Sequence, residues 1–229
     1  ILLVTGKVMA AVKMDMEQAR FNMIEQQIRP WEVLDPEVLD ILAMVRREVF
    51  VPEALKALAF ADLELPIGNG QTMLSPKIEA RVLQEAGVRS TDIVLEVGSG
   101  SGYMAALLAS KAEYVHTVEI DPVLAETARR NLRQAGVSNV SVEIGDAALG
   151  WSGPSPYDVI VLSGSLPGLP DAFLQQLTPG GRLMAFIGTA PVMQARLIIR
   201  SDDQAFNSIN LFETVVPALI TGKRQRFVF

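Results

Sequence analysis

The stretch IVLEVGSGSGY, residues 93–103, decides the fold of this chain. A short β-branched run, typical of a buried strand, passes directly into glycines at 98, 100 and 102, and the helical run MAALLAS follows. Glycines between a strand and a helix let a ligand approach the backbone at the start of the helix. A plain tight turn stays the alternative, because a glycine triad alone is weak evidence.

Strands and helices alternate on the C-terminal side of this turn. Such alternation is typical of an α/β protein with a Rossmann-like, doubly wound, mostly parallel sheet and helices on both faces. We expect this core to span residues 91–229. The predicted strands are 114–120, 139–145, 157–164, 180–188, 195–200 and 209–216, and the predicted helices are 122–136 and 171–177.

The N-terminal side of the turn, residues 14–90, reads as a mostly helical subregion. The run MEQARFNMIEQQIR carries Phe21, Ile24 and Ile28 at helical spacing, which predicts a packed face. Further helices are predicted from DPEVLDILAMV, from a short stretch after residue 52, and from PKIEARVLQEAG at 76–87. Residues 1–13 read as a peripheral extension, with a natural start at Met14 or Met16.

Composition excludes several classes of function. The chain has 229 residues, 49% of them hydrophobic and 20% charged, which predicts one globular domain with a substantial core. The net charge of -6 and the lack of a dense lysine and arginine cluster argue against nucleic acid. Without cysteine and with one histidine, we expect no metal site. No apolar run reaches the roughly 18 residues of a membrane helix, so we expect a soluble protein.

Acidic residues around the glycines indicate which nucleoside is bound. Glu119 lies 21 positions after Gly98, where a carboxylate can accept hydrogen bonds from ribose hydroxyls. Tyr103 occupies the last glycine position of the dinucleotide fingerprint, and Glu96 would repel a pyrophosphate. A carboxylate there suits a cationic sulfonium and ammonium ligand, S-adenosylmethionine. Asp146 is expected at the adenine side, although Glu119 as a helix cap and Asp146 as a turn residue stay open.

The segments EVGSGSGY, VEID, GDAALGW and PGGRL resemble a class I methyltransferase. Others narrow the resemblance to the protein-L-isoaspartate O-methyltransferase family: VRREVFVPE, ELPIGNGQT, GWSGPSPYDVIVL and the terminal RFVF. The resemblance implies a cytoplasmic repair enzyme that methylates isoaspartyl residues of damaged proteins, with S-adenosylmethionine as cofactor and S-adenosylhomocysteine as product. It implies cofactor contacts from Glu96, Gly98, Ser99, Gly100, Gly102, Glu119, Asp146 and Ala147.

The stretch GNGQTMLSPK, residues 68–77, corresponds to the family loop that covers the cofactor beside the acceptor carboxylate. Thr72 matches the threonine of that loop, but Leu74 stands where the catalytic serine is expected and Ser75 is one position late. In an extended loop, that displacement turns a side chain to the opposite face. Thr72 and Ser75 are the candidate catalytic residues. A surface turn is the alternative, because Gly, Asn, Ser and Pro all favour turns.

The chemistry implied needs few catalytic groups. A carboxylate with an unperturbed pKa near 4 is ionised at neutral pH, so the acceptor needs no base. His116, inside a predicted strand, is therefore interpreted as structural, and Lys77 as a solvated residue at a helix start rather than a substrate contact. Leu74, Lys77 and the SGSLP stretch at 163–167 leave open another acceptor, or a protein that binds the cofactor without catalysis. A nicotinamide dehydrogenase is disfavoured. The residues do not predict an oligomeric state.

Overall fold

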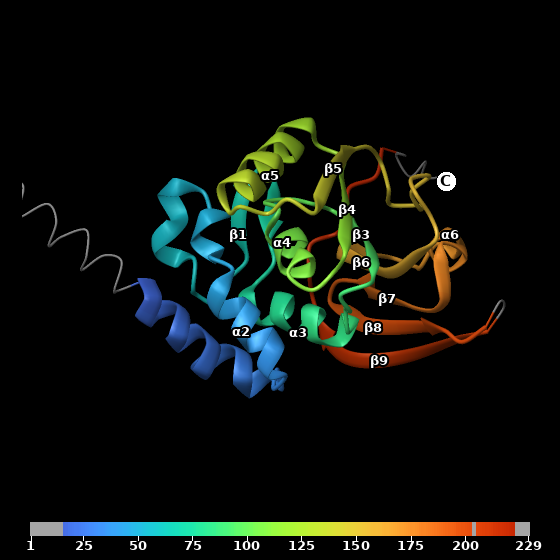
Figure 1. Cartoon of the computed structure of the whole chain (residues 1–229), viewed down its shortest axis with the longest axis horizontal. Helices are drawn as coiled ribbons and strands as arrows, with labels where there is room; N and C mark the ends of the chain where they lie inside the picture. The colour runs from blue at the N-terminus through green and yellow to red at the C-terminus, as the bar shows by residue number, and fades with distance from the viewer. Residues whose placement is uncertain (1–15, 203–204, 223–229) are drawn as a thin grey trace, which may run out of the picture.

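The computed structural model describes residues 16–202 and 205–222 (Figure 1). The predicted extension at 1–13, the start at Met14 and the terminal RFVF lie outside the described residues.

A seven-stranded sheet forms the centre of the described chain, in the order β5-β4-β3-β6-β7-β8-β9. The strands β5, β4, β3, β6 and β7 are parallel, and β8 and β9 extend the sheet by antiparallel pairing. The Rossmann-like prediction is thereby confirmed. The strand bounds are β3 Ile93–Val97, β4 Tyr114–Glu119, β5 Val140–Ile144, β6 Tyr157–Leu166, β7 Leu177–Thr189, β8 Val192–Arg200 and β9 Phe206–Thr214.

Helices cover both faces of the sheet. On one face, α3 (Pro76–Ala86), α4 (Tyr103–Ala109) and α5 (Pro122–Gln134) pack on side chains such as Val94 and Val159. On the other face, Phe173 of α6 (Asp171–Gln175) packs with Leu95 and Ile160. These faces alternate along β3 and β6, as the pleat of a strand requires.

The N-terminal part is helical, as predicted, and gathers at the left of Figure 1. A helix over 16–23 continues into a π-helical turn, η1 (Ile24–Ile28), and a 3-10 turn, η2 (Arg29–Trp31). The helix α2 (Pro36–Met44) follows, and Asp35 caps it through its side chain. Two 3-10 helices, η3 (Arg47–Val49) and η4 (Glu53–Leu58), complete this part.

The predicted packing stripe of the first helix is wrong at one position. Ile24 and Ile28 are buried, but Phe21 is 58% exposed. Arg20 takes the inward place instead, because its guanidinium donates to the buried carboxylate of Glu48 at 2.7 Å. A buried carboxylate needs a charged partner, and this need outweighs the burial of one aromatic ring.

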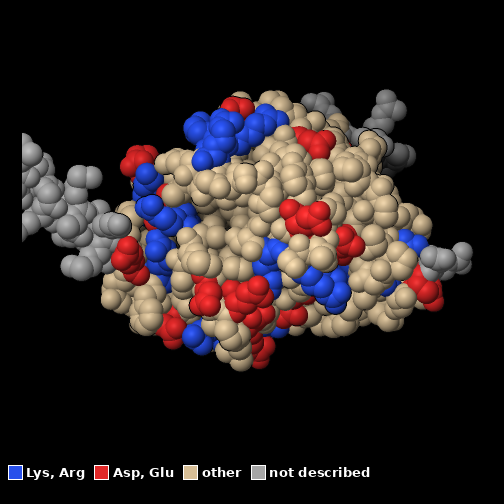
Figure 2. Space-filling view, in the orientation of Figure 1, with Lys and Arg blue, Asp and Glu red and all other residues tan. Residues whose placement is uncertain are grey.

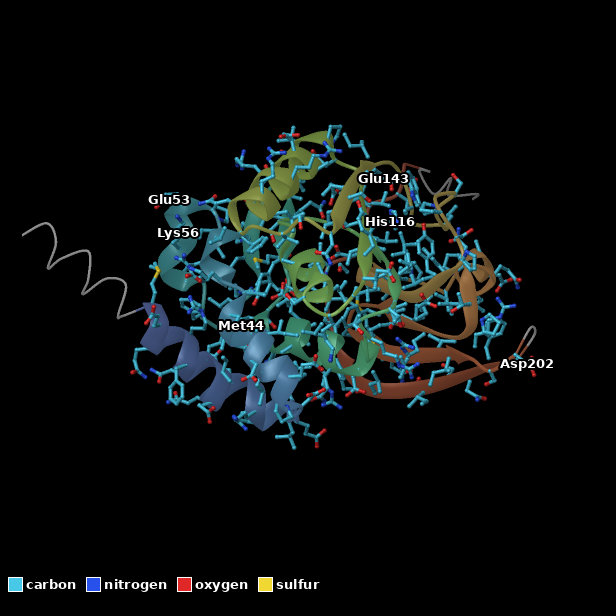
Figure 3. All side chains as sticks on the ribbon, viewed as in Figure 1. Met44, Glu53, Lys56, His116, Glu143 and Asp202 are labelled. Atoms are coloured by element: carbon cyan, nitrogen blue, oxygen red, sulfur yellow. The ribbon has the colours of Figure 1, made fainter. Side chains whose placement is uncertain are left out.

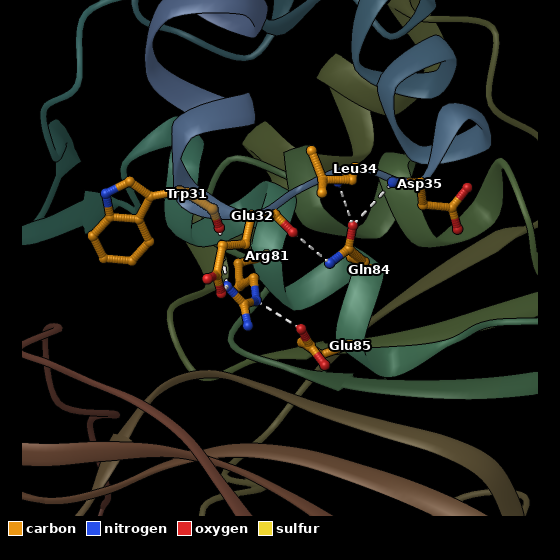
Figure 4. Close-up of polar contacts among 7 residues, drawn as sticks. All are labelled: Trp31, Glu32, Leu34, Asp35, Arg81, Gln84 and Glu85. Atoms are coloured by element: carbon orange, nitrogen blue, oxygen red, sulfur yellow. Dashed lines mark hydrogen bonds and ion pairs between the residues drawn. The ribbon is translucent and has the colours of Figure 1, made fainter.

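Polar contacts fix α3 to the segment before α2 (Figure 4). Arg81 donates to the carbonyl of Trp31 at 2.9 Å, and Gln84 accepts from the backbone N–H of Leu34 at 2.9 Å and donates to the carbonyl of Glu32 at 3.0 Å. Since the last two residues of the GNGQTMLSPK stretch, Pro76 and Lys77, form the start of α3, these contacts hold the C-terminal end of that stretch in place.

Candidate functional site

A cavity opens at the carboxyl ends of the central parallel strands. The chain leaves β3 toward β4 on one side and returns in β6 on the other, so the strand order reverses at this point. Ligands of doubly wound sheets bind in this crevice. We call it the main cavity; its volume is about 580 Å³ with its open mouth included. Its lining includes Thr72, Gly98, Gly100, Glu119, Ala147 and Leu219.

The glycine turn forms one wall of the main cavity. Gly98 and Gly100 adopt φ values of +95° and +49°, which favour glycine. A Cβ at Gly98 would lie 3.0 Å from Leu219, and one at Gly100 would lie 3.1 Å from Ile67. Side chains at these positions would therefore occupy the space through which a ligand reaches the backbone. Gly102, with φ of +86°, instead allows α4 to approach Ala128 of α5.

Glu119 lies at the end of β4 with its carboxylate in the wall of the main cavity. One oxygen accepts from the backbone N–H of Gly100 at 2.8 Å and the other from that of Asp121 at 3.1 Å. Each carboxylate oxygen can accept a second hydrogen bond. The residue is thus held in place while it keeps acceptor capacity toward the cavity.

Glu96 lies behind the main cavity and lines a smaller, adjoining one. Its side chain is fully buried and accepts hydrogen bonds from Thr117 at 2.6 Å and Ser163 at 2.8 Å. Burial raises the pKa of Glu96 to about 8, against the effect of these two hydroxyls. Near neutral pH this carboxyl therefore favours its protonated form, in which one of its oxygens donates to a neighbouring hydroxyl, whereas the sequence suggested an ionised group. Ser99, whose hydroxyl lies 2.6 Å from that of Thr117, joins the same network.

The loop that opens the GNGQTMLSPK stretch is a hairpin turn. It joins β1 (Leu65–Gly68) to β2 (Gln71–Met73), and Gly68, Asn69 and Gly70 all have positive φ. Such φ values suit a tight hairpin connection. At its tip, Asn69 donates to the Asp121 carboxylate at 2.6 Å, and this bond lowers the pKa of Asp121. The loop thereby reaches across to the segment that follows β4, beside the main cavity.

Thr72 is the candidate catalytic residue that the structure brings to the cavities. It lines both the main and the smaller cavity. Its hydroxyl oxygen is buried and makes no hydrogen bond of 3.5 Å or less to the described residues. The same hydroxyl lies close enough to the Glu64 carboxyl to lower its pKa, so Glu64 and a ligand in the cavity are the two acceptors within its reach.

The neighbouring positions differ from Thr72 in their surroundings. Met73 and Leu74 are buried, and both line the smaller cavity. Ser75 is also buried, but it precedes α3 and lies in the lining of neither cavity. The one-residue displacement seen in the sequence therefore places Ser75 outside the smaller cavity that Leu74 lines.

Arg47, which the sequence did not single out, supports this loop from behind. Its fully buried guanidinium donates to the carbonyls of Leu74 and Ala59, each at 2.8 Å, and forms an ion pair with Glu79 of α3. The same group lies 5.0 Å from the ring centre of Tyr103, the first residue of α4. Arg47 therefore connects the loop to the helix that follows the glycine turn.

A second opening, which we call the side cleft, adjoins the main cavity at Pro217 and Ala218. Its volume is about 810 Å³ with the mouth included. Among the described residues that line it, Glu64 alone is charged; the others are Ser165, Pro167, Gly188, Thr189, Ala190, Met193 and Val215–Ala218. Partial burial raises the pKa of Glu64, while the nearby Thr72 hydroxyl acts in the opposite direction.

The remaining predicted residues lie as follows. Ala147 lines the main cavity, whereas Asp146 accepts from the N–H groups of Ala148 at 3.1 Å and Gly222 at 2.8 Å and so shapes the turn after β5. His116 bonds to Ser141 at 2.9 Å and lies beside Glu143 on β4 and β5, outside the cavities described above (Figure 3). This position agrees with its interpretation as structural.

Lys77 is not a free, solvated residue. Its ammonium group pairs with Asp62 at 2.6 Å and lies 4.6 Å from the ring centre of Trp31. Within residues 16–202 and 205–222, no group of three or more His, Asp or Glu side chains could hold a metal ion. No helix among the described residues is long and apolar enough to span a membrane.

Comparisons with known proteins agree with this geometry. The family model for protein-L-isoaspartate(D-aspartate) O-methyltransferase matches residues 18–224. A protein-L-isoaspartate O-methyltransferase of Protochlamydia amoebophila is 40% identical over 82% of this chain and 90% of its own length. One of Methanoculleus marisnigri is 44% identical over 74% of this chain and 77% of its own.

Solved structures give the same picture. A protein-L-isoaspartate O-methyltransferase superposes with a TM-score of 0.75 and 25% identity, over 89% of this chain and 65% of that longer chain. A Plasmodium falciparum protein assigned to the same enzyme, solved in complex with S-adenosyl-L-homocysteine, has a TM-score of 0.73 and 18% identity, over 89% of this chain and 97% of that one. At 18% identity, the similarity to the Plasmodium falciparum structure shows a shared fold only.

Proposed function

This chain belongs to the protein-L-isoaspartate(D-aspartate) O-methyltransferase family, and on that premise we propose how its own residues carry out the reaction. It is an S-adenosylmethionine-dependent carboxyl methyltransferase that acts on isoaspartyl residues of damaged proteins. S-adenosylhomocysteine is the product formed from the cofactor.

The lining of the main cavity offers the groups that the cofactor needs. Gly98 and Gly100 place backbone without side chains in the lining, and Glu119 offers acceptors for ribose hydroxyls. Ala147 provides an apolar wall on the side expected for adenine. When bound, S-adenosylmethionine supplies an electrophilic methyl carbon next to a positively charged sulfur.

Other predicted cofactor residues act from behind the wall. Ser99 and Glu96 belong to the buried network with Thr117, and Gly102 and Asp146 hold the neighbouring turns. We assign them positioning roles. The protonated Glu96 can lose its proton to accommodate a cationic ligand, because a nearby positive charge lowers the pKa of a carboxyl group.

We assign to Thr72 the task of holding the acceptor. The isoaspartyl carboxylate is already ionised at neutral pH, so rate enhancement comes from orientation and from exclusion of water. The buried Thr72 hydroxyl, which has no partner within 3.5 Å among the described residues, is the single observation that carries this proposal, because Thr72 lines the cofactor cavity and a hydroxyl can donate. Leu74 and the loop backbone restrict water on the other side. Ser75 has no equivalent exposure to either cavity.

The acceptor peptide enters through the side cleft in this proposal. The side cleft meets the main cavity at Pro217 and Ala218, and it is larger and more open to solvent. An isoaspartyl side chain that reaches past these residues brings its carboxylate toward Thr72. Most of the cleft is lined by apolar or small residues, which suits an extended peptide of varied sequence.

Several features of the working protein extend this proposal. We place it in the cytoplasm, and we expect no nucleic-acid partner. Figure 2 shows basic side chains gathered over α5, but Arg129 and Arg133 of that helix both pair with Glu126, which supports a solvated face. We also propose that residues 14–90 act as the subregion that supplies the loop, and 91–229 as the cofactor-binding core.

The direct test is transfer of a radiolabelled methyl group from S-adenosylmethionine to a peptide with one isoaspartate. The matched control is the same peptide with ordinary aspartate. Labelling of the isoaspartyl peptide alone is expected. Labelling of neither peptide, with cofactor binding intact, would favour the second candidate, a methyltransferase for another acceptor or a binding protein. Leu74, buried where the family has serine, is the observation that favours this second candidate.

A further inference from the structure

Glu64 places one negative charge at the entrance proposed for the acceptor. It lies directly before β1, its side chain is exposed, and it has no ion pair within 4.0 Å among residues 16–202 and 205–222. The other described residues that line the side cleft carry no charge. The two cations nearest to it in sequence, Lys56 and Lys77, pair with Glu53 at 2.5 Å and with Asp62 at 2.6 Å. The charge of Glu64 is therefore not compensated locally.

The hairpin sets this charge close to Thr72. Pro66 pairs directly with Thr72 across β1 and β2, and Glu64 and Pro66 lie on the exposed side of the strand, on either side of the buried Leu65. Diagonal neighbours on one face of an antiparallel pair are about 7–8 Å apart. The position agrees with the effect of the Thr72 hydroxyl on the Glu64 carboxyl.

Electrostatics then distinguishes between acceptor sequences. The residue next to the isoaspartate in the acceptor peptide then lies near Glu64. An acidic residue at that position is repelled by the Glu64 carboxylate, whereas a lysine or arginine is attracted to it. The separation of about 7–8 Å between Glu64 and Thr72 is comparable to the roughly 8 Å over which physiological salt screens charges, so the effect is expected to depend on salt. We propose that Glu64 makes this enzyme select isoaspartyl acceptors with a lysine or arginine next to the damaged residue. This inference rests on the proposed function.

The test compares three peptides that contain one isoaspartate and differ only in the adjacent residue, which is Lys, Gln or Glu. Each adjacent position, before and after the isoaspartate, is varied in its own series. For the unmodified enzyme at about 50 mM salt, we expect kcat/KM for the Lys peptide to exceed that for the Glu peptide by about tenfold on at least one side. The ratio is expected to shrink in about 500 mM salt.

Variants at Glu64 identify the source of this preference. In Glu64→Gln the Lys-to-Glu ratio is expected to fall to about one, and in Glu64→Lys to invert, with the affinity for S-adenosylhomocysteine unchanged. Glu53→Gln is the matched control, because Glu53 is also an exposed carboxylate but pairs with Lys56 on η4, outside the side cleft. This control is expected to keep the preference of the unmodified enzyme.

Two results would overturn the inference in distinguishable ways. A ratio that is near one in the unmodified enzyme, or that stays the same in Glu64→Gln and Glu64→Lys, would remove Glu64 from acceptor selection while the methyltransferase function stands. A lack of labelling of every isoaspartyl peptide by the unmodified enzyme, with the cofactor bound, would overturn the proposed function and this inference with it.

Discussion

Individual residues decide the chemistry of this site, and Glu96 is the clearest example. It is an acidic residue two positions before Gly98, and its two oxygens face the hydroxyls of Thr117 and Ser163. From the sequence, Glu96 is predicted to belong to the cofactor site. The sequence did not reveal the burial that raises the pKa, because both partners lie in other strands, 21 and 67 positions away.

The raised pKa of Glu96 predicts a pH dependence of stability. Its pKa is about 8 in the folded protein, against 4.5 ordinarily, so the folded state binds more protons between these values. The stabilisation is complete below pH 4.5 and is lost as the pH rises through about 8. We expect the free energy of unfolding of the cofactor-free protein to fall between pH 6 and 8, by up to about 1.4 kcal/mol per unit from this group.

Urea unfolding at several pH values checks this prediction, with Glu96→Gln as the control. The amide does not titrate, so the difference in unfolding free energy between the protein and the variant should change across this interval. Parallel curves for the two proteins would show that Glu96 is already ionised in the folded state.

At the level of secondary structure, most elements follow from sequence patterns. The helix α3 begins at Pro76 and ends before Gly87, as the proline and glycine signals predicted. The antiparallel direction of β8 and β9 was not predicted, because an isolated β-branched run carries no information on its partner. The inward position of Arg20 and the outward position of Phe21 depend on Glu48, which lies 28 residues away from Arg20.

The ion pair between Arg47 and Glu79 predicts how the loop depends on its support. Arg47→Met leaves Glu79 buried without a partner and two carbonyls without a donor, so we expect a loss of about 3–5 kcal/mol in unfolding free energy. The double variant Arg47→Met with Glu79→Met is expected to recover part of this loss, because it removes the uncompensated charge. Denaturant titration measures both. A single variant within 1 kcal/mol of the unmodified protein would contradict this role.

For the whole molecule, the sequence predicted the family, the fold and the place of the cofactor site better than the acceptor side. Glycine turns and strand-to-helix alternation are local signals, and they indicated where the main cavity forms. The side cleft combines Glu64, the end of β7 and the segment around Pro217, which are distant in sequence. No local sequence pattern indicates that these segments lie together. The position of Glu64 at the side cleft and the contacts of Arg47 with the loop were therefore not predicted.

The choice between Thr72 and Ser75 likewise could not be made from the sequence pattern alone. Both hydroxyl residues were candidates, and the backbone register was needed to separate them. Thr72 pairs with Pro66 in the hairpin and lines the cavities, whereas Ser75 precedes α3 after the buried Leu74. Ser75, one position after the place where the family has serine, therefore lies outside the smaller cavity that Thr72 and Leu74 line.

The measurement that tests the central claim most directly is kcat for isoaspartyl peptide methylation by Thr72→Val, Thr72→Ser and Ser75→Ala, with S-adenosylhomocysteine affinity measured in parallel. Removing one positioned hydroxyl donor costs about two to three powers of ten in rate in comparable sites. We predict such a loss in Thr72→Val, recovery in Thr72→Ser, little change in Ser75→Ala, and similar affinities throughout. Full activity in Thr72→Val, or a large loss confined to Ser75→Ala, would contradict the assignment of Thr72.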